Sequence, residues 1–213
     1  MIMDNFTVIL LYFTSFFTLM NPLGIMPVYL TMTSSLTKKE RNKTAVKAVI
    51  TATVTLILFA FAGKYLFDFF GISVAGLKVV GGIIFFFVGY DMLNARLARI
   101  KINEDEVEEY VDDISVTPLG IPMIAGPGAI TNAIVLMGDA HNYTTKILVV
   151  ASIVLVTFIV LIALLGASGI LKFIGDKGVK IMTKLMGLIV MVIAVEFFFS
   201  GITPYVQAMF SIK

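Results

Sequence analysis

The sequence contains no cysteine and a single histidine, His141. The missing cysteines exclude disulfides and thiolate metal sites, and a lone histidine leaves no zinc-binding set. There is also no phosphate-binding P-loop and no HExxH helix, and a hydrolase triad would have to use His141. No Lys or Arg precedes the first apolar run, so we expect that run to stay in the mature protein rather than act as a cleaved signal peptide. We therefore expect no enzyme, no metal and no cofactor.

What the sequence has instead is long apolar runs. Hydrophobic residues make up 59% of the 213 residues and the mean hydropathy is +1.00, far above a soluble globular domain. A helix needs roughly 20 apolar residues to cross a hydrocarbon layer of about 30 Å, whereas barrel strands are about 10 residues long and alternate. The sequence predicts an all-α membrane protein with six transmembrane helices. We place these spans at 6–30, 45–62, 74–95, 114–137, 147–165 and 179–201.

The basic residues are distributed unevenly between the connecting segments. If alternate connections share one side of the membrane, that side holds twelve of the 16 Lys and Arg residues, in segments 36–47, 96–101 and 172–184. The opposite side holds only Lys64, Lys78, Lys146 and Lys213. The positive-inside rule then predicts that both termini lie outside the cytoplasm, in a protein of the cell membrane. Because the basic segments flank membrane spans, we expect them to set topology and to bind no nucleic acid.

A short motif occurs twice. Pro22-Leu23-Gly24 matches Pro118-Leu119-Gly120 at an offset of 96 residues, and weaker likenesses follow in the same order in both halves. Each half holds three spans, so the second must enter the membrane from the opposite side. We predict two inverted-topology three-helix repeats, 1–95 and 114–213, joined by a charged cytoplasmic connector at 96–113, in a single membrane domain. The acidic residues of this connector are most simply solvated.

Both copies of the motif interrupt an apolar span with proline. Proline has no backbone N–H, so the carbonyl one turn back loses its hydrogen-bond donor. An unpaired carbonyl is costly in lipid unless protein or water donates a hydrogen bond to it. Gly126-Pro127-Gly128 should end one helical piece and start another. A helix that begins inside the membrane offers free N–H groups to a carboxylate. Carbonyls of the preceding piece, with Asn21, Thr117, Thr131 or Asn132, would receive an ammonium group or a small cation.

Two explanations of the breaks are open. One is that they are tolerated kinks satisfied by neighbouring hydroxyls or water. The other is a binding site between the halves, which two breaks at matching positions favour. No Arg lies deep in any span, so a strongly anionic solute would lack a partner, whereas a zwitterion can use both polarities of a broken helix. The glycines let backbone come close to the solute and leave little room for a bulky side chain on it. Small neutral amino acids fit this description, but the sequence alone does not single them out.

The same residues carry a family resemblance. "NPLGIMPVYL" (21–30) and "TPLGIPMIAGPGAI" (117–130) resemble the MarC family of six-span membrane proteins, over essentially the whole chain. The resemblance implies two inverted repeats with spans one and four discontinuous and substrate held at the breaks. It also implies transport of glycine and alanine, driven by a proton or ion gradient. The implied substrate-binding positions are Asn21, Pro22, Leu23, Gly24, Thr117, Pro118, Leu119, Gly120, Ala125, Gly126, Pro127, Gly128 and Ala129.

Two carboxylates lie within predicted spans and are candidates for coupling to protons. They are Asp91 in span three and Glu196 in span six, at roughly equivalent positions of the repeats. The alternative for both is hydration or capping near the membrane interface. Sodium coupling would use carbonyls and Thr or Asn oxygens around the breaks instead.

The leading hypothesis is a secondary transporter of small neutral amino acids that works by alternating access. A passive channel or an exporter of another small polar solute could use the same breaks. A membrane-embedded enzyme lacks a nucleophile–base pair, and a scaffold gives no reason for paired helix breaks.

Overall fold

The computed structural model describes residues 5–94 and 107–210, which are almost entirely helical and contain no strand. In chain order the elements are α1 (Asn5–Met20), α2 (Pro22–Met32), α3 (Lys38–Phe70), α4 (Val74–Leu93), α5 (Val107–Ile114), η3 (Ser115–Ile124), α6 (Pro127–Gly138) and α7 (Tyr143–Phe210). Most of the predicted connector, with Arg96, Arg99 and Glu104, lies outside the described residues.

The described helices supply the membrane spans that the apolar runs predict. Five stretches are long and apolar enough to cross a membrane, namely Phe6–Met32, Lys38–Phe70, Val74–Leu93, Tyr143–Ala167 and Lys184–Phe210. The pair Val107–Ile124 and Pro127–Gly138, bent by 61°, makes a sixth if it is one span. The prediction of an all-helical membrane protein is confirmed.

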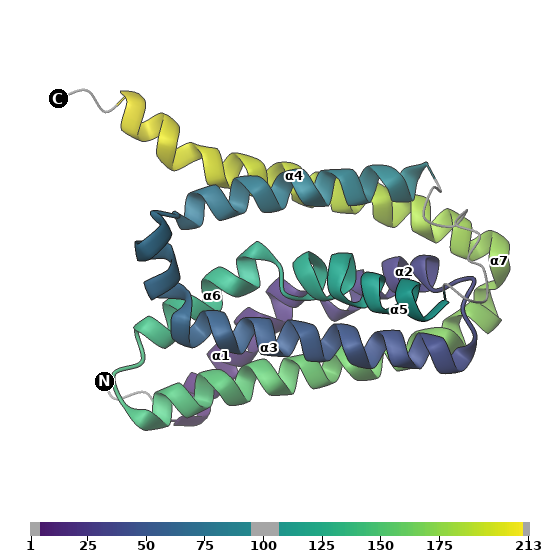
Figure 1. Cartoon of the computed structure of the whole chain (residues 1–213), viewed down its shortest axis with the longest axis horizontal. Helices are drawn as coiled ribbons and strands as arrows, with labels where there is room; N and C mark the ends of the chain where they lie inside the picture. The colour runs from purple at the N-terminus through teal and green to yellow at the C-terminus, as the bar shows by residue number, and fades with distance from the viewer. Residues whose placement is uncertain (1–4, 95–106, 211–213) are drawn as a thin grey trace.

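Helix α7 differs from the sequence-based expectation. We expected a loop between spans five and six, but the helix is continuous from Tyr143 to Phe210. The first proline after Tyr143 is Pro204, so every residue in between has the N–H that a helix requires. Figure 1 shows α7 running along the lower edge, turning at the right and returning along the top.

The helices form two layers in Figure 1. Helix α4 packs mainly against α7 and only slightly against α6 and η3. We call α4 together with Lys184–Phe210 of α7 the arm. The other described helices, with Tyr143–Ala167 of α7, are the bundle, in which α3 packs against η3, α6 and α7.

The two arm helices approach one another through small residues. A Cβ atom added to Gly82 would lie 2.7 Å from the Ala194 carbonyl oxygen, and one added to Gly89 would lie 2.7 Å from that of Gly187. At Gly201 the added atom would lie 2.6 Å from the Ala75 carbonyl oxygen. These positions recur every seven residues on each helix, which keeps them on one face. Backbone therefore meets backbone along the arm, as membrane helices with small interface residues allow.

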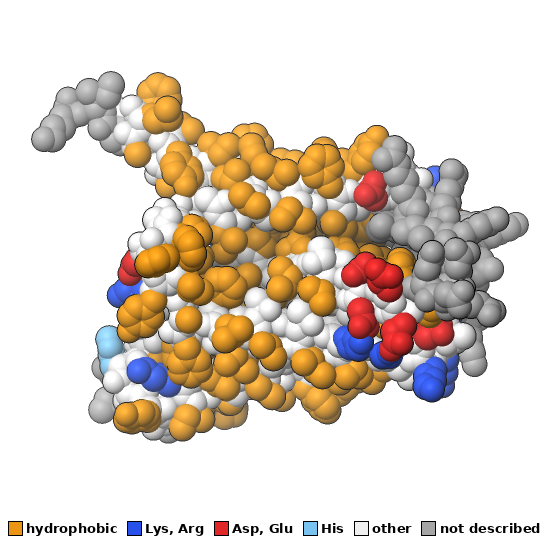
Figure 2. Space-filling model, viewed as in Figure 1, with side chains coloured by type: hydrophobic (Ala, Val, Ile, Leu, Met, Phe, Trp, Pro, Cys, Tyr) orange, Lys and Arg blue, Asp and Glu red, His pale blue; other side chains and the backbone are white. Residues whose placement is uncertain are grey.

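Charges gather toward the two ends of the face in Figure 2, with a broad apolar region between them. At the right-hand end, α5 pairs with the start of α3. Lys43 Nζ lies 2.5 Å from Glu108 Oε1, and Lys47 pairs with Asp112. The described end of the acidic connector is thus a helix whose exposed carboxylates pair with Lys43 and Lys47, and the sequence did not predict this pairing.

Lys43→Glu is expected to lower the melting temperature in detergent by no more than a few degrees. Lys43 and Glu108 are solvent-exposed, and exposed pairs contribute little because water screens them. The decrease in melting temperature should be smaller at about 1 M salt, because the Debye screening length is then only about 3 Å. Adding Glu108→Lys should restore the wild-type value by reversing the pair. A large decrease that salt leaves unchanged would contradict an ionic role.

Candidate functional site

The first interruption lies between α1 and α2, at Asn21. Its backbone is left-handed, with φ 44° and ψ 68°, a conformation that Asn tolerates better than most residues. Pro22 has no N–H, so the carbonyl of Thr18 cannot receive its usual helical bond. The Gly24 N–H donates to Asn21 Oδ1 at 3.1 Å, which caps α2. A Cβ at Gly24 would lie 2.3 Å from Asn21 Nδ2, so a larger residue there would displace the capping side chain of Asn21.

The second interruption is longer and lies within η3 and before α6. Thr117 and Ile121 have extended rather than helical dihedrals, each directly before a proline. The chain then bends by 61° and α6 begins at Pro127 with Gly126 as its N-cap. No side chain caps this end, so the first N–H groups of α6 have neither helical nor side-chain partners.

The repeat offset of 96 residues relates the two interruptions only in part. It places Asn21 opposite Thr117, and both have non-helical dihedrals. In the first half a regular helix resumes at Pro22, but in the second half it resumes only at Pro127. The second half therefore holds a longer irregular segment than the sequence repeat predicts.

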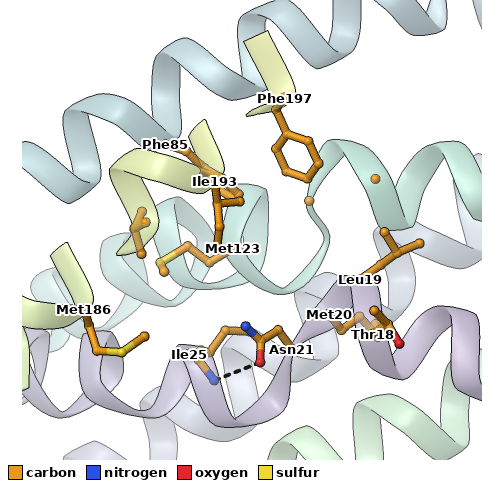
Figure 3. Close-up of a pocket in the computed structure, with 14 residues that line it drawn as sticks. Thr18, Leu19, Met20, Asn21, Ile25, Phe85, Met123, Met186, Ile193 and Phe197 are labelled. Atoms are coloured by element: carbon orange, nitrogen blue, oxygen red, sulfur yellow. Dashed lines mark hydrogen bonds between the residues drawn. The ribbon is translucent and has the colours of Figure 1, made fainter. Parts of the chain in front are cut away.

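One cavity of about 260 Å³ joins both interruptions. Its walls come from the arm on one side and from the bundle on the other, as Figure 3 shows. Only Thr18 and Asn21 contribute polar side chains, and no charged residue lines it. The lining residues are Thr18, Leu19, Met20, Asn21, Gly24, Ile25, Phe85, Met123, Gly126, Gly128, Met186, Val190, Ile193 and Phe197.

Helix ends bring backbone groups to the cavity in addition to the Thr18 and Asn21 side chains. The N-terminal ends of α2 and α6 both reach it, at Gly24 and at Gly126 and Gly128, and helix N-termini carry partial positive charge. The C-terminal end of α1 reaches it at Thr18, whose carbonyl Pro22 leaves without a helical donor. A solute here would meet polar backbone at these helix ends and, elsewhere, mainly apolar side chains.

Four of the predicted site residues line this cavity: Asn21, Gly24, Gly126 and Gly128. The others do not, although they shape the interruptions: Pro22, Leu23, Thr117, Pro118, Leu119, Gly120, Ala125, Pro127 and Ala129. Leu23 is 71% exposed and Thr117 is also exposed, whereas Leu119 and Ala125 are fully buried. Pro127 packs against α4, where a Cβ at Gly81 would overlap its ring.

Sequence reasoning missed the arm side of the cavity. Phe85 comes from α4, and Met186, Val190, Ile193 and Phe197 follow one face of α7. Their spacing fits a helix face, but neighbouring residues are equally apolar, so periodicity does not mark them out.

The coupling candidates lie outside the cavity lining. Glu196 is exposed on α7, and Asp91 is half-buried near the end of α4, so both belong to the arm. On the bundle side, Thr131 Oγ1 is buried and has no hydrogen-bond partner among the described residues. Its neighbour Asn132 donates from Nδ2 to Ser15 Oγ at 2.9 Å, which links α6 to α1. The described residues contain no group of three or more His, Cys, Asp or Glu side chains arranged for a metal.

Comparison with known proteins identifies the family. The profile described as "MarC family integral membrane protein" matches residues 6–206. The chain belongs to the MarC family. Among its MarC relatives, a UPF0056 membrane protein of Methanocaldococcus jannaschii is 40% identical over 194 residues, covering 91% of this chain and 95% of the relative. YhcE, a UPF0056 membrane protein of Escherichia coli, is 32% identical over 209 residues, covering 93% of each. No solved structure matches this MarC protein significantly.

Proposed function

We propose that this MarC family protein is a secondary transporter of small neutral amino acids of the glycine and alanine class. The solute is held in the cavity between the two helix interruptions and is moved by alternating access. The observation that carries the proposal is the single cavity lined by Asn21 and Gly24 from one interruption and by Gly126 and Gly128 from the other.

The chemistry of the cavity supports a zwitterionic solute. The uncapped α6 N-terminus presents N–H groups suited to a carboxylate, whereas the Gly24 N–H of α2 is already bonded to Asn21. The Thr18 carbonyl and the Asn21 side chain present oxygens suited to an ammonium group. No charged side chain lines the cavity, so a net charge would be buried without a partner, at high cost.

The size of the cavity supports a small solute. Drug-sized ligands occupy pockets of about 300–1,000 Å³. At about 260 Å³ this cavity is below that range, and Phe85 and Phe197 occupy part of the space around it. A glycine or alanine molecule fits with room for a few waters.

The proposed architecture is two inverted three-helix repeats with discontinuous first and fourth spans. Non-helical dihedrals at Asn21 and Thr117 support it, as does the antiparallel pairing of the third and sixth spans within the arm. In Figure 1 the start of α1 and the end of α7 lie at the same end of the molecule, opposite α5. Helix α5 carries Glu108, which pairs with Lys43 near the start of α3. With the basic segments in the cytoplasm, both termini lie outside it.

We also propose that solute transport is coupled to the movement of protons or of sodium ions. Glu196 and Asp91 are the proton candidates, because carboxylates within spans are expensive and often functional. For sodium, the unpartnered Thr131 hydroxyl and carbonyls at the interruptions supply oxygen ligands.

Glycine and alanine are expected to raise the melting temperature of the purified protein in a concentration-dependent manner. A ligand that binds only the folded state adds about 2.7 kcal/mol of stability at 100 times its Kd. Glutamate and lysine serve as controls and should leave the melting temperature unchanged, because the cavity offers their extra charge no partner. Equal shifts with all four compounds would contradict a zwitterion site.

Proteoliposomes preloaded with unlabelled glycine or alanine should accumulate the labelled compound by counterflow. Counterflow distinguishes alternating access from a passive channel, which would only equilibrate the label. Absence of any flux would overturn the transport proposal.

A further inference from the structure

The arm has the internal contacts of a rigid body. At Gly82, Gly89 and Gly201, an added Cβ would lie within 2.7 Å of a backbone atom of the facing helix. If one arm helix slid past the other, residues with a Cβ would replace the glycines opposite the facing backbone and would clash with it. The arm helices are therefore expected to keep their relative position when other parts of the protein move.

Contacts between helix α4 of the arm and the bundle are sparser. Helix α4 has few contacts with α6 and η3 compared with those it makes with α7. The cavity is lined by Phe85, Ile193 and Phe197 of the arm and by Asn21 and Gly126 of the bundle. Arm and bundle approach closely at Gly81, which lies directly against the Pro127 ring. Because Pro127 is the first residue of α6, a shift of α4 at this point acts on the α6 N–H groups that face the cavity.

The arm is joined to the bundle by segments able to bend. Between α3 and α4, Gly71 has a left-handed φ of 63° with open space around it, and Ser73 caps the new helix. On the α7 side, Gly166 and Gly169 have no neighbouring atom within 4 Å of an added Cβ. Hinges in proteins are usually a few residues in loops or at the ends of elements, as Gly71 is. Gly166 and Gly169 lie within α7, where each glycine lowers helix stability by roughly 1 kcal/mol relative to alanine.

Resting on the proposed function, we propose that the arm moves as one rigid body against the bundle, with Gly81 and Pro127 as the pivot, and that this movement gates the cavity. When the arm tilts about this pivot, the gap between arm and bundle widens on one side of the pivot and narrows on the other side. The same movement tilts the start of α6, so solute binding and arm position depend on each other.

Distance measurements between spin labels test this directly, because the chain has no cysteine to remove. Three comparably exposed valines provide attachment sites: Val80 on α4, Val192 on α7 and Val54 on α3. The pair Val80→Cys and Val192→Cys reports within the arm, and the pair Val80→Cys and Val54→Cys reports between arm and bundle. Distances are measured in nanodiscs with and without saturating glycine, and counterflow of each labelled variant is measured in parallel.

The arm–bundle distance is expected to change by more than about 2 Å or to split into two populations, while the within-arm distance stays single. A bismaleimide matched in length to each measured distance should stop counterflow for the arm–bundle pair and spare it for the within-arm pair. Counterflow with an unmoved arm–bundle distance, or a changing within-arm distance, would overturn the inference and leave the transport proposal intact. A moving arm in a protein without counterflow would support the inference and overturn the transport proposal.

Discussion

Gly128→Leu is expected to abolish glycine and alanine uptake while leaving the protein folded. A Cβ at Gly128 would lie 3.0 Å from Leu19 Cδ2 and 3.5 Å from Phe197 Cζ, both ends of side chains that can shift. The isobutyl group then occupies the cavity beside the α6 N–H groups. A bound solute would then be overpacked against this group. If binding loses about 3 kcal/mol, the upper range for overpacking, affinity for the solute falls roughly 100-fold. Initial uptake rates and glycine-dependent melting shifts measure this loss.

Gly138→Leu is the matched control, because it lies on the same helix and has open space around it. It should retain uptake and the melting shift. Gly126→Leu should also abolish uptake, but by a different route. Its Cβ would lie 2.9 Å from the Pro122 carbonyl oxygen, a backbone atom that cannot swing away, so the second interruption itself is distorted. Normal uptake by Gly128→Leu would show that the solute is held elsewhere.

Gly89→Leu is expected to produce the largest loss of stability. The added side chain meets the Gly187 carbonyl oxygen at 2.7 Å, and only separation of the arm helices relieves the contact. The cost should reach about 3 kcal/mol, more than the roughly 1 kcal/mol that replacing a helical glycine recovers. The net loss is therefore about 2 kcal/mol, which for a chain of this size corresponds to a melting temperature roughly 4–8 °C lower.

Gly166→Leu provides the comparison, since it also replaces a helical glycine but meets no atom within 4 Å. It should leave the melting temperature unchanged or raise it slightly. Gly187→Leu should destabilise as much as Gly89→Leu, and the double variant less than the sum, because both break one contact. Additive losses would mean that the two glycines pack independently.

The membrane spans illustrate what composition alone determines. Each predicted run overlaps a helix or a bent helix pair, with boundaries that differ by several residues. The agreement arises because hydrocarbon admits only segments that satisfy their own backbone, so length and hydropathy leave few alternatives. The uninterrupted path of α7 was not predicted, because charged residues around Lys172 suggested a loop, whereas helix continuation depends on backbone geometry.

The candidate site shows where such reasoning ends. Proline chemistry predicts interruptions near Asn21 and Gly126 because the missing N–H is a property of the residue itself. It does not predict that Leu23 is exposed, or that Phe85 and Phe197 complete the cavity. The segments "LKVVGGII" (77–84) and "TKLMGLIV" (183–190) place Gly81 and Gly187 at the same position of a similar pattern, but in the structure Gly81 meets Pro127 while Gly187 meets Gly89.

The sequence by itself determined a helical membrane protein of the MarC family, its spans and the positions where helices must be interrupted. These follow from hydropathy, from proline and glycine stereochemistry and from a nearly complete family match. The tertiary structure alone decided which faces meet, and hence that an arm closes over both interruptions. When nearly every side chain of a span is apolar, periodicity no longer separates inside from outside, and only close packing between helices selects the face.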